Sequence, residues 1–168
     1  MDIFELIKTR RSIRKFTEEP VSDEIIDRII EAGTWAPSGL NNQPWKFAVI
    51  RDKELKANIA KLTRYSRTVL NANTLIAVFL DNSLSYDRTK DCQGIGACIQ
   101  NILLAVHSAG FGAVWLGEIL KNKDKVRQML AEGSPDLELM AVIALGHPAE
   151  KGGKGMRNDF RDTIVFRG

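Results

Sequence analysis

The sequence predicts a single domain of the α/β or α+β class, in which a sheet of four or five strands lies between layers of helices. Segments with apolar residues at helical spacing alternate along the chain with short, continuous apolar runs that are typical of buried strands. The 168 residues, 44% of them hydrophobic, are sufficient for one domain with a sizeable core. Repeats and low-complexity tracts are absent from the sequence.

Polar residues and glycines predict where the helices of the first half begin and end. Asp2 and Ser22 each precede a segment with apolar residues at helical spacing, and Gly33 is the expected stop of the second segment. Asp52 is the expected start of a third helix. Two apolar runs are the expected strands of this half, residues 46–51 and 74–80.

The second half begins with the longest helical segment, residues 91–109, which Gly110 ends. Because this segment is apolar on nearly all sides, we expect it at the centre of the protein. The expected elements that follow it are a strand at 111–116, a helix at 122–130 and strands at 137–145 and 162–166. The last strand has no obvious local partner, which suggests that it is exchanged with a second subunit.

The composition describes a mildly basic protein of mixed charge, with 24 Lys and Arg against 21 Asp and Glu. Cys92 and Cys98 are too few for a disulfide framework, and we expect both to be unreactive core thiols. The N-terminal residues lack the pattern of a signal peptide, and no apolar run approaches the roughly 20 residues that span a bilayer. We therefore expect a soluble, cytoplasmic protein.

The sequence lacks the usual signatures of catalytic side chains. His107 and His147 are not spaced with cysteines or carboxylates in the manner of metal ligands, so we expect no metal site. Neither the glycine motif of dinucleotide-binding folds nor a phosphate-binding P-loop is present. Two polar segments remain as candidates for a binding site.

The first candidate is a basic cluster at residues 9–16 (TRRSIRKF), which carries four positive charges within six positions. One explanation is a solvated helix end, where cations interact favourably with the helix dipole. In an extended segment, however, Arg10, Ser12 and Arg14 would share one face and offer two guanidinium groups and a hydroxyl to an anion. A phosphorylated small molecule fits such a face.

The second candidate is a polar loop at residues 36–45 (APSGLNNQPW). Its residue types are also those of ordinary turns. The amides of Asn41, Asn42 and Gln43 can both donate and accept hydrogen bonds, and the indole of Trp45 can stack. This mixture suits a heteroaromatic ring with carbonyl and N–H edges.

The motifs together resemble the FMN-dependent nitroreductase family. They are R-R-S-x-R, A-P-S-x-x-N-x-Q-P-W, G-F-G-x-x-W-x-G and A-L-G-H-P before a basic stretch, and the resemblance covers essentially the whole chain. It is closest to compact members, which lack a long insertion before the central helix. The resemblance implies an α+β fold with a mostly antiparallel sheet, and an intertwined homodimer that exchanges its C-terminal strands and binds FMN at its interface.

The resemblance also implies which residues bind FMN. Arg10 and Ser12 match contacts to the phosphate and ribityl chain, Arg14 matches the pyrimidine side of the ring, and Arg11 lies near the cofactor. The residues that match the loop over the partner subunit's flavin are Pro37, Ser38, Gly39, Asn41 and Gln43.

Further cofactor residues are implied in the second half of the chain. The strand end at Trp115, Leu116, Gly117 and Glu118 matches the stretch whose last two backbone N–H groups approach flavin N5 and O4. Arg157 matches a phosphate-binding arginine, with Lys154 nearby, although the family usually spaces this basic pair more tightly and follows it with proline. The expected polar neighbour of the ring in the middle of the fold is either Asn71 or Asn73.

The activity that the resemblance implies is a ping-pong oxidation of NAD(P)H, with hydride passed through FMN to a nitroaromatic, a quinone or another flat acceptor. Such chemistry requires no catalytic side chain, because the flavin carries it. One alternative is a flavin-binding or flavin-sensing protein without efficient turnover, and another is a diverged reaction such as dehydrogenation or reductive dehalogenation. A nucleic-acid-binding module with Trp35 and Trp45 as stacking platforms is disfavoured by the net charge of only +3.

Overall fold

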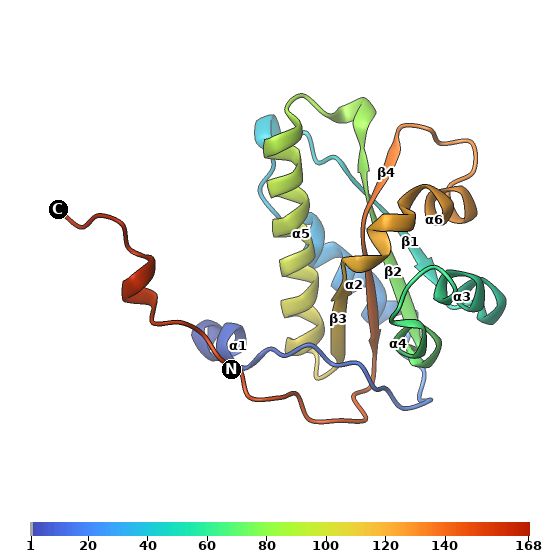
Figure 1. Cartoon of the computed structure of the whole chain (residues 1–168), viewed down its shortest axis with the longest axis horizontal. Helices are drawn as coiled ribbons and strands as arrows, with labels where there is room; N and C mark the ends of the chain where they lie inside the picture. The colour runs from blue at the N-terminus through green and yellow to red at the C-terminus, as the bar shows by residue number, and fades with distance from the viewer. Residues whose placement is uncertain (1) are drawn as a thin grey trace.

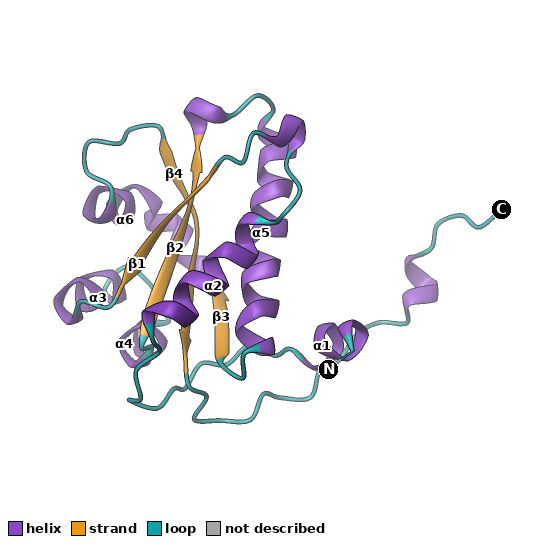
Figure 2. Ribbon diagram, turned by 180° about the vertical axis from the view of Figure 1, so that it is seen from behind, coloured by secondary structure: helices purple, strands orange, loops and turns teal. Residues whose placement is uncertain are grey.

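The computed structural model describes residues 2–168 (Figure 1). At its centre is a four-stranded antiparallel sheet with the strand order β1-β2-β4-β3. The strands are β1 (Trp45–Ile50), β2 (Thr74–Asp81), β3 (Gly112–Leu116) and β4 (Leu137–Gly146). Helices cover both faces of the sheet, as Figure 2 shows from the other side, which confirms the predicted α+β architecture.

The strand β2 is buried along its whole length. It pairs with β1 on one edge and with β4 on the other, and helices cover its two faces. A strand in this position has no face in contact with water, which explains why residues 74–80 form a continuous apolar run.

One face of the sheet is covered by α2 (Asp23–Thr34) and α5 (Arg88–Ser108). The hydroxyl of Ser22 accepts a hydrogen bond from the backbone N–H of Ile25, which is the predicted N-cap of α2. The helix α5 turns one side to the sheet and to α2, while Gln93 and Gln100 on its other side are exposed. It therefore covers one face of the sheet with its other side exposed, whereas the sequence placed it at the centre of the protein.

The opposite face is covered by α3 (Lys53–Ala60), α4 (Ser66–Asn71), α6 (Lys123–Leu130) and a 3-10 turn, η3 (Glu118–Asn122). Asp52 caps α3 as predicted, because its carboxylate accepts a hydrogen bond of 2.7 Å from the N–H of Leu55. The helix α4 is not among the elements expected from the sequence. No helix within residues 2–168 is both long and apolar enough to cross a membrane.

The two cysteines of α5 lie in different environments, and both are free thiols. Cys98 is fully buried, and burial raises the pKa of its thiol to about 12, which makes it the unreactive core thiol that the sequence predicts. Cys92 is only half-buried, so the same expectation is wrong for this residue.

Both ends of the chain leave the body of the protein on the same side, as α1 (Ile3–Thr9) and the C-terminal residues show in Figure 1. The strand predicted at 162–166 is not formed in the single chain. Phe160–Thr163 form a 3-10 turn, η4, that the Asp159 carboxylate caps by accepting from the N–H of Arg161. A strand needs a neighbour for its hydrogen bonds, and none of the described residues pairs with this segment.

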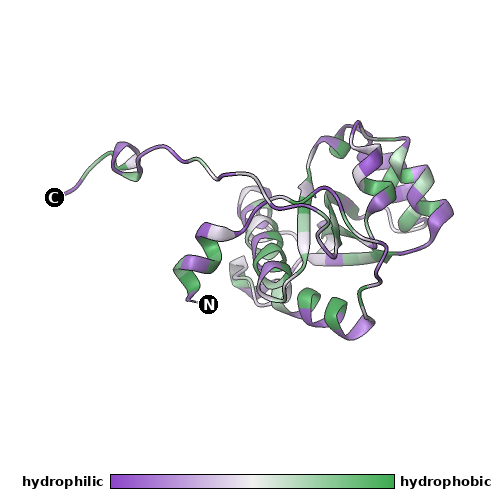
Figure 3. Ribbon diagram, turned by 90° about the horizontal axis from the view of Figure 1, so that it is seen from below, coloured by the Kyte–Doolittle hydropathy of each residue, from purple (hydrophilic) through white to green (hydrophobic). Residues whose placement is uncertain are grey.

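Large apolar side chains are exposed on both of these ends, and parts of both ends are coloured as hydrophobic in the ribbon of Figure 3. They are Ile3, Phe4 and Ile7 on α1, and Phe160, Ile164, Val165 and Phe166 near the C-terminus. The exchange of the C-terminal segment with a second subunit stays a prediction.

Candidate functional site

The basic cluster leaves the end of α1 and runs beside the outer edge of β3. Ser12 forms an isolated parallel bridge with Ala113, and the N–H of Ile13 donates a hydrogen bond of 2.9 Å to the Ala113 carbonyl. Both Arg11 and Ile13 lie against Gly152, so these alternate side chains share one side of the segment. Arg10, Ser12 and Arg14 are the alternate residues of the opposite side.

The guanidinium group of Arg11 is occupied by backbone carbonyls. It donates to the oxygens of Gly153, Lys8 and Arg10 at 2.9, 2.5 and 2.8 Å. A Cβ atom at Gly152 would lie 2.3 Å from the Cβ of Arg11, so the close approach of the two segments requires glycine there. Arg11 thus ties the N-terminal segment to the glycine-rich segment near the C-terminus.

Arg10 lies close to Arg157, although the two residues come from opposite ends of the chain. The pKa of Arg10 is lowered by burial and by the positive charges of Arg157 and Arg11. Neither Arg10 nor Arg157 takes part in an ion pair within residues 2–168. Like charges brought together without an ion-pair partner form an arrangement that a bound anion would stabilise.

A cavity of about 360 Å³ lies beside Arg10 and Arg11, between α5 and β3. His107 of α5 lines it and contacts the hydroxyl of Thr9 at 2.9 Å. Burial, Arg10 and Arg11 lower the pKa of His107, so its ring is neutral at pH 7 and leaves the guanidinium groups as the positive charges there.

Glu150 is the acidic residue of the cavity wall, and its carboxylate is bound by neighbouring groups of the protein. Its carboxylate accepts a hydrogen bond of 3.0 Å from the backbone N–H of Arg14 and lies 3.7 Å from the ammonium of Lys15. The pKa of Glu150 is lowered first by the hydrogen bond from Arg14. The side chain of Arg14 is exposed at this point of the segment.

The C-terminal end of β3 carries the predicted stretch from Trp115 to Glu118. Trp115 is 42% exposed, Leu116 is buried and Gly117 is exposed. The strand pairs with β4 up to Leu116, after which the chain turns into η3. The backbone of Gly117 is therefore at the surface where the strand ends.

The side chain of Glu118 is fixed by neighbours that sequence reasoning did not identify. Its carboxylate accepts hydrogen bonds from the Thr63 hydroxyl at 2.7 Å and from the N–H of Arg64 at 3.2 Å, and it pairs with Lys121. The bonds from Lys121 and Thr63 lower the pKa of Glu118 to about 2. The Glu118 carboxylate thus binds the turn before α4. The backbone of Glu118 follows shortly after the end of β3.

The predicted polar loop lies at the other end of α5. It includes the 3-10 turn η1 (Gly39–Asn41), and the Ser38 hydroxyl accepts a hydrogen bond of 3.0 Å from the N–H of Gln43. Leu40, Asn41 and Gln43 have positive φ angles of 52°, 55° and 45°, which are uncommon for residues other than glycine. Pro37 approaches α5 so closely that a Cβ at Gly94 would lie 3.4 Å from its carbonyl oxygen.

Asn42 anchors this loop to α5. Its amide donates to Asp91 Oδ1 at 2.7 Å and to the carbonyl of Leu84 at 3.0 Å. The Asp91 carboxylate, only 1% exposed, also accepts from the Ser85 hydroxyl at 2.6 Å. The sequence indicates the hydrogen-bonding amide of Asn42 but not this role, because Asp91 is distant from Asn42 in the chain.

A single chain does not bring the polar loop and the basic cluster together. The loop contacts α5 at Asp91, whereas the N-terminal segment contacts it at His107. At 1.5 Å per residue, the helix between these two points is about 24 Å long. The loop and the cluster are therefore separate surfaces of the single chain.

Three other predicted residues lie apart from the basic cluster or make no described contact with it. The amide of Asn73 donates to the Thr17 carbonyl at 3.2 Å and accepts from the His147 N–H at 3.3 Å, so it is a structural link. Asn71 is exposed at the end of α4. Lys154 is exposed and has no hydrogen bond or ion pair within the described part of the chain.

Comparisons with known proteins identify the family of this chain. The model of the nitroreductase family matches residues 7–68 and 63–147. A protein of Methanothermobacter thermautotrophicus, provisionally named NADH dehydrogenase/NAD(P)H nitroreductase, is 39% identical over 155 residues, which are 91% of this chain and 81% of that protein.

Solved structures give the same result. A provisionally named nitroreductase of Desulfovibrio desulfuricans, crystallised in complex with FMN, has a TM-score of 0.94 and 44% identity, covering 100% of this chain and 98% of its own. The NADPH:FMN oxidoreductase of Vibrio harveyi, complexed with NAD⁺, has a TM-score of 0.88 and 25% identity, covering 98% of this chain and 76% of its own. The chain therefore belongs to the nitroreductase family.

Proposed function

We propose that this protein is an FMN-dependent oxidoreductase that oxidises NAD(P)H and reduces a nitroaromatic, a quinone or another flat acceptor in a ping-pong reaction. Its family membership and the FMN or nicotinamide in the names and structures of its relatives support this proposal. The observation that carries it is the proximity of Arg10 and Arg157 without a carboxylate partner. Two guanidinium groups match the doubly negative phosphate of FMN, to which they would donate charge-assisted hydrogen bonds.

The remaining residues of the cluster fit the rest of the cofactor. The hydroxyl of Ser12 would hydrogen-bond the phosphate or ribityl chain, and Lys154 belongs to the same proposal as a second, more mobile cation. Arg14 would place positive charge at the pyrimidine edge of the ring, where it stabilises negative charge in the reduced state. Arg11 would support the site by holding the two ends of the chain together.

Bound FMN would supply the hydride-transfer chemistry, and the chain would orient the ring. The backbone N–H groups of Gly117 and Glu118 would donate to the ring edge at the end of β3. The Glu118 carboxylate is bound by Thr63 and Lys121, so it would not add a second negative charge beside the ring. Hydride transfer by the flavin does not require an acidic or basic side chain.

The working unit in this proposal is a homodimer in the cytoplasm. The polar loop of one chain, with Pro37, Ser38, Gly39, Asn41 and Gln43, would cover the flavin held by the basic cluster of the other chain. The separation of these two groups along α5 supports such an arrangement. The apolar side chains exposed on α1 and on the C-terminal segment would be buried between the two copies, and the C-terminal segments would be exchanged.

The absorbance spectrum of the purified protein, recorded before and after anaerobic addition of NADH or NADPH, tests this function. We expect a flavin spectrum that at least one nicotinamide bleaches within a catalytic time, and that a quinone or nitroaromatic restores. A yellow protein that keeps its colour with both nicotinamides would instead be a flavin-binding protein. A colourless protein that takes up no FMN and sediments as a single chain would contradict the proposal.

A further inference from the structure

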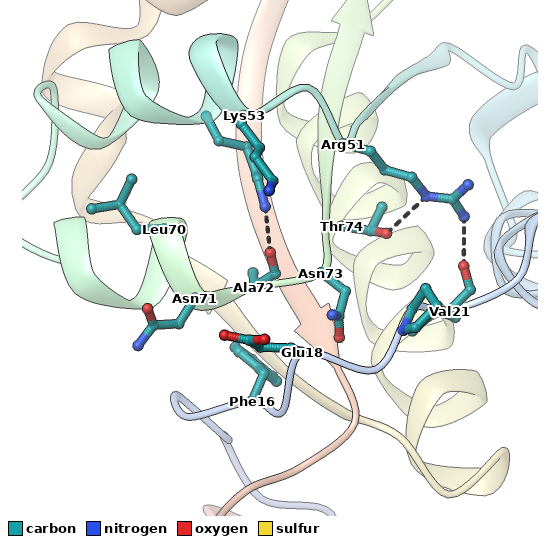
Figure 4. A pocket seen from close by; sticks show the side chains of 12 residues that line it. Phe16, Glu18, Val21, Arg51, Lys53, Leu70, Asn71, Ala72, Asn73 and Thr74 are labelled. Carbon is teal, nitrogen blue, oxygen red and sulfur yellow. Dashed lines mark hydrogen bonds between the residues drawn. The ribbon is translucent and has the colours of Figure 1, made fainter.

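A second cavity, of about 680 Å³, lies at the β1 side of the sheet, where α3, the end of α4 and the segment before α2 meet (Figure 4). Its volume lies within the range of roughly 300–1,000 Å³ that is common for small-molecule sites. None of its lining residues lines the cavity beside Arg10. The two cavities therefore have separate linings, although this one includes Asn71 and Asn73, one of which the family resemblance places near the flavin ring.

The wall of this cavity contains a buried positive charge without an acidic partner. Lys56 of α3 is 8% exposed, and its ammonium donates a hydrogen bond of 2.7 Å to the carbonyl of Ala72. No ion pair within residues 2–168 includes Lys56. Since an ammonium group has three N–H donors, the contact with Ala72 satisfies only one of them.

A buried charge of this kind is unfavourable unless it is paired. Burial and, after it, the neighbouring charge of Lys53 lower the pKa of Lys56. Lys53, which is labelled in Figure 4, lies one turn earlier on α3. It lines the same cavity as Lys56, so two lysines contribute positive charge to the wall.

The other charged residues of the wall do not neutralise these lysines. Arg51 donates to the Val21 carbonyl at 2.9 Å and to the Thr74 hydroxyl at 3.2 Å, and it is paired with Asp23. Glu18 is the acidic residue of the lining, and its exposed side chain forms no described ion pair with a lysine. The wall as a whole carries a positive charge, with Lys56 as its buried part.

The lining also has an apolar part. Phe16 and Val21 are buried, while Leu70 is 49% exposed beside the cavity. Asn71 follows Leu70 at the C-terminal end of α4. Its amide makes no described hydrogen bond, so it is available to a ligand. A pocket with apolar walls and a few polar groups is the usual form of a small-molecule site.

We propose that this cavity binds a small organic anion, whose phosphate or carboxylate group accepts the hydrogen bonds that Lys56 does not give to Ala72. Lys53 adds positive charge at the same end, and the apolar part of the ligand lies against Phe16 and Leu70. This ligand is bound in addition to the anion held by Arg10 and Arg157.

The test uses the protein saturated with FMN, so that the Arg10 cavity is filled before any probe is added. Phenyl phosphate, benzoate and inorganic phosphate are titrated by calorimetry, which shows whether phosphate or carboxylate is preferred and whether the ring contributes. We expect phenyl phosphate or benzoate to bind more tightly than inorganic phosphate. Lys56→Met should weaken the binding at least tenfold, whereas Lys61→Met, which changes an exposed lysine just after the same helix, should not change it.

Lys56→Gln separates ligand binding from a purely structural contact. Glutamine can still donate to the Ala72 carbonyl but has no charge, so a folded Lys56→Gln protein should also bind the probes at least tenfold more weakly. Equal affinities in wild type, Lys56→Gln and Lys56→Met would overturn the proposal, as would the failure of all three probes to bind the wild-type protein. Because binding is measured directly, an absence of reductase activity would contradict the proposed function without affecting this result.

Discussion

The amide of Asn42 donates a hydrogen bond of 2.7 Å to the carboxylate of Asp91, which is almost completely buried at the start of α5. Burial alone would raise the pKa of this carboxyl group, but the hydrogen bonds from Ser85, Asn42 and the backbone of Asp87 and Tyr86 outweigh that effect and lower it. The contact fixes the polar loop, with its three positive φ angles, on the central helix.

The first prediction concerns this contact. Asn42→Ala should lower the free energy of unfolding by about 1.5–3 kcal/mol, the range for a hydrogen bond to a charged group. Gln93→Ala is the control, because Gln93 is an exposed amide on the same helix, and its effect should be within about 0.5 kcal/mol. Urea unfolding at pH 7 measures both variants. Equal stability of Asn42→Ala and the wild type would show that Asn42 does not anchor the loop.

The second prediction concerns the proposed phosphate site. Arg10→Ala should weaken FMN binding by roughly 1.5–3 kcal/mol, because a charge-assisted hydrogen bond to the phosphate is lost. Titration of the apoprotein with FMN, followed by the change in flavin fluorescence, gives the dissociation constant. Arg28→Ala, which removes an exposed arginine of α2, should leave it unchanged. Unaltered affinity in Arg10→Ala would assign the phosphate to other residues.

The third prediction concerns the C-terminal segment. Truncation before Asp162 removes Ile164, Val165 and Phe166, all exposed in the single chain, and should give monomers or aggregates that lack flavin. Removal of Arg167 and Gly168 alone keeps the apolar residues and should preserve a yellow dimer. Analytical ultracentrifugation with detection of flavin absorbance distinguishes the products. A stable yellow dimer after the longer truncation would rule out the proposed exchange.

The fourth prediction concerns the pH dependence of stability. The pKa of Glu118 is about 2 in the folded protein, against an ordinary value of 4.5, because of its bonds with Lys121 and Thr63. A depressed folded-state pKa stabilises the fold above the unfolded value, and this contribution is lost as the pH falls from about 4.5 through about 2.

Glu118→Gln should therefore make the free energy of unfolding fall less steeply over this pH window than it does in the wild type. Glu132→Gln, at an exposed glutamate without a described ion pair, should follow the wild-type curve. Unfolding curves at closely spaced pH values give both slopes. Parallel curves for wild type and Glu118→Gln would contradict the assigned pKa.

The parts of the fold that could be predicted from the sequence are those with a local cause. Burial on both faces makes β2 an uninterrupted apolar run, and its observed start at Thr74 agrees with the prediction. The hydroxyl of Ser22 and the carboxylate of Asp52 mark helix starts within three residues of the groups that they bind. In the site, the alternation from Arg10 to Arg14 is a local feature of the same kind.

The errors and omissions have either a weak local signal or a long-range cause. The helix α4 is only six residues long and has no side-chain cap, so propensity alone could not identify it. Residues 162–166 have a strand-like composition, but their conformation depends on a partner that the single chain does not supply. The Asn42–Asp91 contact and the Thr63–Glu118 contact join distant positions, and a single sequence does not record which distant residues meet.

The clamp that Arg11 forms on the glycine-rich segment has a consequence for the order of events in the cell. Arg10 precedes Arg157 by most of the described chain, and Arg11 brings their segments together only when both have been made. A growing chain that has not yet reached Gly153 therefore lacks the clamp. In the proposed function, the anion site would be complete only after Arg157 is made, so the cofactor would bind late in synthesis.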